Sequence, residues 1–381
     1  MSRDRALVTS VMPLRISART RVLSAVKVGG NRYPALTGVR ALGAMVVFFD
    51  HFPLWANSHL TLNVMAFFFA LSGFLIVRIY YEQAALDRRW LAKYFVNRFA
   101  RIYPIYFLLL SIAVLIHHGF RPWVLVTNYT LTHALFSNVH FIIQPSWSLT
   151  VEECFYLLAP LFMVLARVRN FLAAFALGCF LLLAALLVST LGIGFLGSPS
   201  FVLSTTFFGN FVEFFAGVYI ALVVIRLEKN GRIYVPGGRC TAAGAAGVAF
   251  LAIAMILVYR RVSLDLAAVI LINNFLIPFP IALLYWGLIR EKTMLSRLLS
   301  SKALRLLGSG SYSFYLLHTL IIDYVSVPLL ASTGGYRPLY VALTFIVTWI
   351  ISILLFLVYE EPLNLFIREK FRSKAFRTAE T

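Results

Sequence analysis

Long apolar stretches alternate with short polar ones along almost the whole chain. A helix needs roughly 20 residues to cross the hydrocarbon core of a bilayer, and about ten stretches come near that length. Because a spanning segment must satisfy its own backbone hydrogen bonds in lipid, we expect helices and not strands. The pattern predicts an all-α, polytopic membrane protein with about ten transmembrane helices, near residues 38–57, 60–81, 102–118, 147–167, 171–195, 207–227, 240–259, 265–289, 310–332 and 337–360.

Composition agrees with this class. Of 381 residues, 61% are hydrophobic and only 13% are charged, more apolar surface than a soluble domain of this size can bury. The net charge of +19 is compatible with nucleic-acid binding, but the basic residues form short clusters between apolar stretches and not one patch. Three scattered cysteines, Cys154, Cys179 and Cys240, give neither a disulfide framework nor a zinc-site spacing, and we expect no metal.

The basic residues also predict an orientation. All but four of the 34 lysines and arginines lie in the two terminal segments or in alternate connections between the apolar stretches; the four are Arg121, Arg260, Arg261 and Arg337. Since cytoplasmic loops carry the excess of lysine and arginine, both termini are predicted to be cytoplasmic.

The same pattern suggests three parts. We expect a flexible, basic cytoplasmic segment at 1–32, a transmembrane domain at 33–366 and a basic cytoplasmic tail at 367–381. Residues 1–37 lack the apolar core and cleavage site of a signal peptide, although a transit peptide is an alternative to a flexible tail.

Ionisable residues interrupt the first apolar stretch, "RALGAMVVFFDHFP" (40–53), at Arg40, Asp50 and His51. Ionisable groups at membrane depth are costly and usually mark a functional site. At 1.5 Å per residue, His51 lies about 16 Å along the helix from Arg40.

A second such stretch is "SWSLTVEECFY" (146–156), which carries Glu152 and Glu153. Counting helical rise from the outer surface puts these carboxyls at about the depth of His51, so we expect them to form one centre. Ser148 and Tyr156 share a helix face with Glu152, and Glu153 points elsewhere. Either glutamate is a candidate for the site.

Two further segments, 87–104 and 291–310, mix basic and apolar residues at helical spacing. Each is typical of an amphipathic helix on the inner leaflet. In the first, Arg98 and Arg101 are three residues apart and share a face, so together they can bind a phosphate.

Six motifs, spread over nearly the whole chain, resemble those of the membrane acyltransferase-3 family and follow that family's order. They are "YPALTGVRALGAMVVFFDHF" (33–52), "FFFALSGFLI" (67–76), "NRFARIYPIY" (97–106), "SWSLTVEECFYLLAP" (146–160), "GSGSYSFYLLHTLII" (308–322) and "YEEPLNLF" (359–366). Thr37 and Asp50 depart from the family's usual residues.

The resemblance implies ten core helices and transfer of an acyl group, commonly acetyl, from acyl-coenzyme A to a hydroxyl of a carbohydrate or other acceptor. It pairs Arg40 with His51, which suits one extended donor: the arginine binds phosphate and the histidine acts as general base at the thioester. The family pattern also covers Glu152 and Glu153, which we therefore include as catalytic candidates.

Other residues have two readings each. His318, in the family motif, and Tyr312 are candidates for orienting the donor; a histidine hydrogen-bonded between helices is the alternative. Trp147 and Asp50 are candidates for contact with the acceptor. Alternatively, Trp147 belongs to the aromatic belt at the membrane interface and Asp50 is a helix-packing carboxyl. We expect Ser72 and Gly73 to permit close helix packing, and Glu360 and Glu361 to end the last helix and pair with basic residues.

Acceptors expected from the resemblance are bacterial surface glycans, including lipid-linked ones, which would place the chain in a bacterial inner (plasma) membrane. Antibiotic-type macrolides and lipo-oligosaccharides are alternative acceptors. Two other classes stay open. A transporter or flippase of glycans or lipids would also have about ten spans and buried charge, although no inverted repeat is found. A non-catalytic lipid-binding protein would not need arginines beside a deep histidine and glutamates.

Overall fold

The computed structural model describes residues 33–51, 60–192, 194–231, 237–262, 266–333 and 337–377. Within these ranges the chain forms helices and loops, and its only strand-like pairing is an isolated bridge between Phe136 and Phe195. The predicted all-α fold is therefore confirmed.

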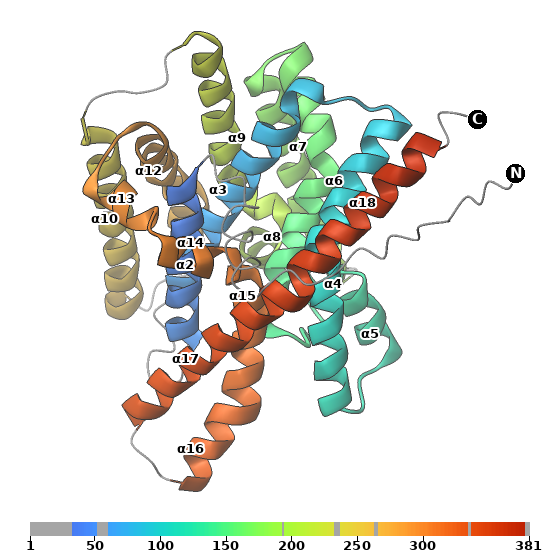
Figure 1. The fold of residues 1–381 in the computed structure, drawn as a ribbon, viewed down its shortest axis with the longest axis vertical. Helices are drawn as coiled ribbons and strands as arrows, with labels where there is room; N and C mark the ends of the chain where they lie inside the picture. Colours follow the sequence, from blue (N-terminus) through green and yellow to red (C-terminus); the bar gives the residue numbers. More distant parts are fainter. Residues whose placement is uncertain are drawn as a thin grey trace, which may run out of the picture.

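The longer helices are α2 (Pro34–His51), α3 (Leu60–Tyr80), α4 (Arg88–Ile116), α6 (Trp147–Val168), α7 (Phe171–Ser189), α9 (Phe207–Lys229), α10 (Arg239–Val262), α12 (Pro278–Arg290), α15 (Ser311–Ile321), α17 (Arg337–Leu355) and α18 (Glu361–Arg377). Shorter helices lie between them: α5 (Pro122–Tyr129), α8 (Pro199–Thr205), α11 (Leu266–Leu271), α13 (Met294–Leu299), α14 (Lys302–Ser309) and α16 (Val327–Thr333). Figure 1 shows their arrangement.

Nine helical segments of the described chain are long and apolar enough to cross a membrane, and they fall on nine of the predicted spans. The chain is therefore a multi-pass membrane protein. The remaining prediction, 38–57, falls on α2, which is 18 residues long and is not among the nine, because Arg40 and Asp50 lower its hydropathy. Residues 52–57 of that prediction lie outside the described residues.

Helix α4 is longer than predicted. The interfacial segment 87–104 and the span 102–118 form one helix of 29 residues, with Pro104 inside it. Asp87 caps its start by accepting hydrogen bonds from the backbone amides of Arg89 and Trp90, each at 3.0 Å. At 1.5 Å per residue the helix is about 44 Å long, so its basic first turns reach beyond the hydrocarbon core.

Segment 291–310 forms two short helices, α13 and α14, and not one amphipathic helix. Both pack against α2. The segment therefore supports the helix that carries Arg40.

Helices α3 and α9 form the most closely packed pair at the centre of the molecule (Figure 1). A Cβ atom added to Gly73 would lie 2.1 Å from the carbonyl oxygen of Phe214, and one added to Gly217 would lie 1.8 Å from that of Ala70. Glycine is thus required on both sides of the contact, as small residues are in many membrane helix pairs. This confirms the packing role expected for Gly73.

Three π-helical turns interrupt the helices: η4 (Ile272–Leu276), η5 (Ile322–Ser326) and η6 (Phe356–Glu360). Such turns are frequent at functional sites. Each one carries a polar or ionisable side chain, namely Asn273 and Asn274 in η4, Asp323 in η5 and Glu360 in η6.

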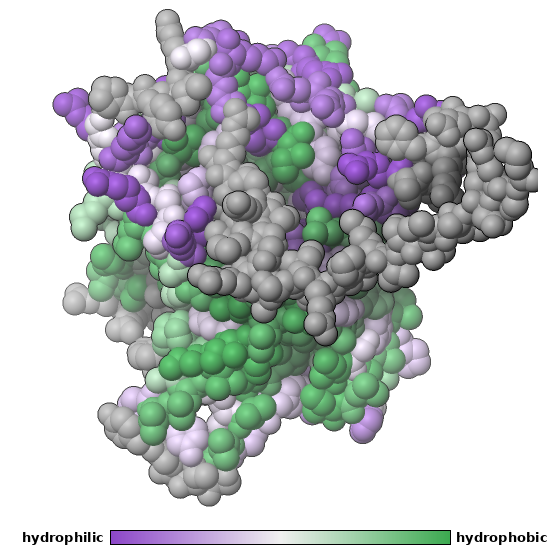
Figure 2. Space-filling model, in the orientation of Figure 1, coloured by the Kyte–Doolittle hydropathy of each residue, from purple (hydrophilic) through white to green (hydrophobic). Residues whose placement is uncertain are grey.

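Hydrophilic residues gather at one end of the molecule, above a broad apolar region (Figure 2). This end holds the start of α4 and the ends of α9 and α12 (Figure 1), with the basic clusters predicted to be cytoplasmic. Which side of a membrane it faces stays a prediction. The predicted boundary between domain and tail at 366 falls inside α18, which packs against α4.

Candidate active site

A cavity of about 140 Å³ lies between α2, α3, α4, α6 and α15. Five of the predicted site residues line it: Arg40, Arg98, Arg101, Glu152 and Tyr312. The structure therefore brings together the three arginines that the sequence assigned to the donor, although they come from two helices.

Arg98 projects from α4 between two tyrosine rings. Its guanidinium lies 5.5 Å from the ring centre of Tyr80 and 5.6 Å from that of Tyr156, and Nη2 donates to the Tyr80 hydroxyl at 3.3 Å. The Nε atom is buried and has no hydrogen-bond partner among the described residues. Cation–π contacts thus fix the side chain while part of its donor capacity is left for a ligand.

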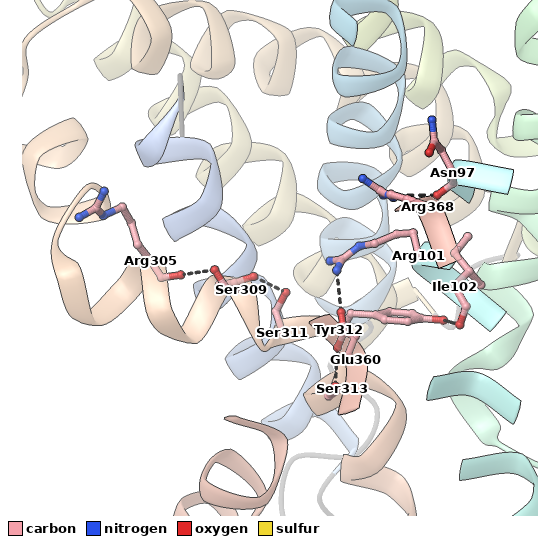
Figure 3. Close-up of polar contacts among 11 residues, drawn as sticks. Asn97, Arg101, Ile102, Arg305, Ser309, Ser311, Tyr312, Ser313, Glu360 and Arg368 are labelled. Atoms are coloured by element: carbon pink, nitrogen blue, oxygen red, sulfur yellow. Dashed lines mark hydrogen bonds and ion pairs between the residues drawn. The ribbon is translucent and has the colours of Figure 1, made fainter. Parts of the chain in front are cut away.

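Arg101, one turn further along α4, forms an ion pair with Glu360. Nη1 of Arg101 lies 2.6 Å from Oε1 of Glu360, whose side chain is 2% exposed. The other carboxyl oxygen accepts a hydrogen bond of 2.6 Å from the Ser313 hydroxyl. Tyr312 lies beside the pair: its ring centre is 5.8 Å from the Arg101 guanidinium, and its hydroxyl donates to the Ile102 carbonyl at 3.0 Å (Figure 3).

Glu360 belongs to the site through its ion pair with Arg101, whereas the sequence predicted that it ends the last helix and pairs with a basic residue. Pairing with a basic residue is confirmed, but Glu360 does not end the last helix, because the chain continues from η6 directly into α18. Its position within the "YEEPLNLF" motif was the available signal.

Arg40 also lines the cavity, on α2. No hydrogen bond or ion pair joins it to any described residue, and the nearby charges that act on it are those of Arg101, Glu360 and Glu152. Three guanidinium groups therefore face two carboxyl groups. The cavity carries an excess of positive charge whatever the protonation of the carboxyls, which favours an anionic ligand.

The two glutamates of α6 are separated by the structure. Glu152 lines the cavity and accepts a hydrogen bond from the Ser72 hydroxyl, which also accepts one of 3.4 Å from Tyr156. Glu153 does not line it, and one of its carboxyl oxygens is buried with no partner among the described residues.

The expected cluster of His51 with these glutamates is not found in the described structure. Glu152 lies within electrostatic range of Arg40, which is about 16 Å along α2 from His51. Helical rise alone therefore did not give the relative depth of residues on two different helices, although α6 begins at Trp147 as predicted.

His51 instead meets His318. The two imidazole rings, one on α2 and one on α15, lie with their centres 5.1 Å apart and their planes 79° apart. His318 is fully buried and its ring stacks on Phe314. The sequence suggested a role for each histidine but gave no sign that they touch.

Hydrogen bonds define the proton positions on both rings. Nδ1 of His51 lies 2.9 Å from the carbonyl oxygen of Val47, and Nδ1 of His318 lies 2.7 Å from that of Tyr315. A carbonyl oxygen only accepts, so each Nδ1 carries the hydrogen and Nε2 of the neutral ring keeps its lone pair. Nε2 of His318 is buried without a partner among the described residues.

Tyr315 stands between the cavity and the two histidines. It lines the cavity, its ring centre is 5.9 Å from that of His318, and its hydroxyl lies 2.7 Å from the Ser148 hydroxyl and 2.9 Å from the Pro145 carbonyl oxygen. Tyr315 was not among the site residues predicted from the sequence. Its position three residues before His318, on the same helix face, was the available signal.

The two acceptor candidates do not line this cavity. Asp50 accepts hydrogen bonds from the backbone amide (2.9 Å) and hydroxyl (2.5 Å) of Thr61 in the first turn of α3, as a helix-packing carboxyl does. Trp147 begins α6 and contacts Phe69 edge-on, with ring centres 6.4 Å apart. Among the described residues no group of histidines, cysteines and carboxylates could hold a metal ion.

Comparison with known proteins identifies the same family that the sequence motifs resemble. The profile of the membrane acyltransferase-3 family, described as an acyltransferase domain, matches residues 33–357. No solved structure gives a significant match.

Several named relatives are similar over most of the chain. The peptidoglycan O-acetyltransferase OatA of Listeria monocytogenes is 26% identical over 82% of this chain and 53% of its own length. The putative peptidoglycan O-acetyltransferase YrhL of Bacillus subtilis is 28% identical over 88% and 55%. The acyltransferase MdmB of Streptomyces mycarofaciens is 27% identical over 77% and 80%. The chain thus spans about half the length of the first two relatives.

Proposed function

Since this chain belongs to the membrane acyltransferase-3 family, we propose that it is an integral membrane O-acyltransferase. It takes an acyl group, commonly acetyl, from acyl-coenzyme A and transfers it to a hydroxyl of a carbohydrate or lipid-linked glycan. The names of two relatives, both peptidoglycan O-acetyltransferases, support a glycan acceptor.

The observation that carries this proposal is the cavity with excess positive charge at one end of α2 and the paired histidines at the other. Coenzyme A is a phosphate-rich anion with a long, flexible arm that ends in the thioester. Arg40, Arg98 and Arg101 bind the phosphates, and the arm extends along α2 over the roughly 16 Å to His51. Tyr312 and Glu152 shape the cavity around the donor.

His51 is the proposed general base. Its Nδ1 hydrogen is held by the Val47 carbonyl, so the lone pair on Nε2 is available to take the proton of the acceptor hydroxyl. The hydroxyl oxygen then forms the ester bond with the thioester carbonyl carbon as the carbon–sulfur bond breaks. The departing sulfur takes up the proton, and free coenzyme A leaves.

His318 is a positioning residue in this scheme. It packs edge-on against His51, and its own Nδ1 is committed to Tyr315. A buried, neutral imidazole in this place holds the His51 ring and adds no charge that would disfavour protonation of His51 during transfer. Glu153 and Trp147 do not line the cavity. Their roles, as a catalytic candidate and a candidate for acceptor contact, therefore rest on the sequence prediction alone.

We assign the arginine end of the molecule to the cytoplasm, where acyl-coenzyme A is made, and the chain to a bacterial inner membrane. The distribution of lysine and arginine supports this orientation. Donor and general base would then lie at different depths of the same membrane.

The test uses the full chain, purified in lipid nanodiscs, with acetyl-coenzyme A and a soluble tetramer of N-acetylglucosamine. We expect release of free thiol and a tetramer heavier by one acetyl group, measured by mass spectrometry. Arg40→Gln and Arg98→Gln should each weaken coenzyme A binding by roughly 10- to 150-fold, the effect of losing one charge-assisted hydrogen bond.

Arg89→Gln is the matched control, because Arg89 is exposed at the start of the same helix α4. Unchanged donor affinity in both cavity variants would contradict the proposed donor site. Passage of glycan across vesicles without a change in mass, and without thiol release, would favour the transporter alternative.

A further inference from the structure

A second cavity, of about 330 Å³, lies at the opposite end of the molecule from the cavity lined by Arg40, Arg98 and Arg101. Its wall includes His117, which follows α4 and is 16 residues beyond Arg101, or about 24 Å along the helix. The loop before α6, the end of α15 and the π-helical turn η5 complete the wall. We call it the outer chamber.

The outer chamber adjoins the histidine pair. Thr319, the residue after His318, lines it, and the Thr319 hydroxyl is buried without a hydrogen-bond partner among the described residues. Asp323 in η5 also lines it and lies within electrostatic range of His51. A ligand that contacts Asp323 in the chamber therefore lies within electrostatic range of the proposed base, on the side away from Arg40, Arg98 and Arg101.

The chemistry of the wall differs from that of the arginine cavity. No lysine or arginine lines it among the described residues; its polar groups are carboxyl, amide, imidazole, phenol and hydroxyl, including exposed Asp323 and Gln144. Aromatic rings lie between them: His140 stacks on Phe120, with planes 20° apart. Flat aromatic faces beside hydrogen-bonding groups of both kinds suit a neutral, hydroxyl-rich ring, which has apolar C–H faces and a polar edge.

We propose that the outer chamber binds the glycan acceptor, which rests on the function proposed above. The sugar ring stacks on the aromatic wall at Phe120 and His140, and Asp323 and Gln144 bind its hydroxyls. One further hydroxyl is directed towards His51. Anionic donor and neutral acceptor thus occupy separate sites on either side of Tyr315, His318 and His51.

Binding is tested directly, without catalysis, by saturation-transfer NMR of the N-acetylglucosamine tetramer with the full chain in nanodiscs. Phe120→Ala and Asp323→Asn should each weaken tetramer binding by about 3- to 30-fold, because each removes a stacking surface or a charged acceptor. Asn138→Ala is the control, since Asn138 is exposed in the loop that carries His140 but does not line the chamber.

Coenzyme A affinity, measured on the same samples, verifies that the variants are folded. Equal tetramer binding by the wild type and both chamber variants would overturn the chamber proposal, as would no binding to the wild type at millimolar tetramer. Failure of the proposed function has a different signature: tetramer binds in the chamber as expected, but acetyl-coenzyme A releases no thiol.

Discussion

The imidazole rings of His51 and His318 meet edge-on with their centres 5.1 Å apart, although they belong to α2 and α15. Both rings use Nδ1 to donate to a backbone carbonyl of their own helix. The two rings differ in exposure: His318 is fully buried, whereas His51 is partly exposed and can meet a substrate.

This asymmetry predicts different effects of the same substitution. His51→Gln keeps a polar side chain but cannot take a proton, so the transfer rate should fall by about 10²- to 10⁴-fold with coenzyme A affinity nearly unchanged. His318→Gln should lower the rate less and shift its pH profile, because it alters the surroundings of His51. Full transfer activity in folded His51→Gln protein would move the base elsewhere.

The two neighbouring glutamates should also separate. Glu152→Gln replaces an acidic group of the arginine cavity with a neutral amide and should slow transfer severely, since Glu152 lies near Arg40 and accepts the hydrogen bond from Ser72. Glu153→Gln should behave nearly as wild type because Glu153 does not line the cavity. Steady-state kinetics with varied donor checks this, and the reverse order would show that Glu153 is the site residue.

Breaking the buried ion pair between Arg101 and Glu360 should destabilise the fold more than breaking an exposed pair does. Glu360→Gln leaves Arg101 without its counter-ion in a largely buried site and should lower the free energy of unfolding by roughly 3 kcal/mol. Glu82→Gln breaks the exposed Glu82–Lys229 pair and should cost below about 1 kcal/mol. Thermal unfolding in detergent measures both, and equal losses would contradict the burial argument.

The stability of the fold should depend on pH because His133, which lies between α5 and α6, is buried. It is fully buried, and burial lowers its pKa to about 4 from 6.5. The unfolded chain therefore binds a proton more readily than the folded one, so stability is complete above about pH 6.5 and is lost as the pH falls towards 4. His133→Gln should flatten the change in melting temperature between pH 7 and pH 5.

The orientation predicts which loops react from outside. In a variant whose native cysteines are serine, Asn138→Cys should react with an impermeant thiol reagent on intact cells, and Asn230→Cys should not. Both positions are exposed, one between α5 and α6 and one at the end of α9. Labelling of position 230 alone would reverse the orientation, and the assignment of the arginine end to the cytoplasm with it.

Local pattern was enough to predict most of this fold. Apolar length located nine of the spans, but it missed the start of α4, because the basic residues of 88–101 lower the hydropathy of any window that includes them. Helical spacing correctly put Arg98 and Arg101 on one face. The packing role predicted for Gly73 is confirmed, whereas Ser72, for which the same role was predicted, lines the cavity and donates a hydrogen bond to Glu152.

Contacts between helices that are far apart along the chain could not be predicted from the sequence. Arg101 and Glu360 are 259 positions apart, and nothing in either motif says that α4 and η6 touch. The same holds for His51 and His318. Depth along separate helices cannot be compared without their tilt and true ends, which is why Glu152 was expected beside His51 and lies beside Arg40 instead.

The π-helical turns bear on how the site tolerates changes in chain length. Each π turn holds one more residue than an α-helical turn, so it absorbs a one-residue insertion and leaves the helical segments on either side in register. Deleting one residue from η6 would therefore restore regular winding and change mainly the backbone around Glu360. Deleting one residue from the regular part of α17, by contrast, would rotate one side of the helix by about 100° relative to the other. Glu360 could then no longer meet Arg101 while the rest of α17 keeps its contacts, so we expect the site to tolerate a deletion in the π turn better than one in the helix before it.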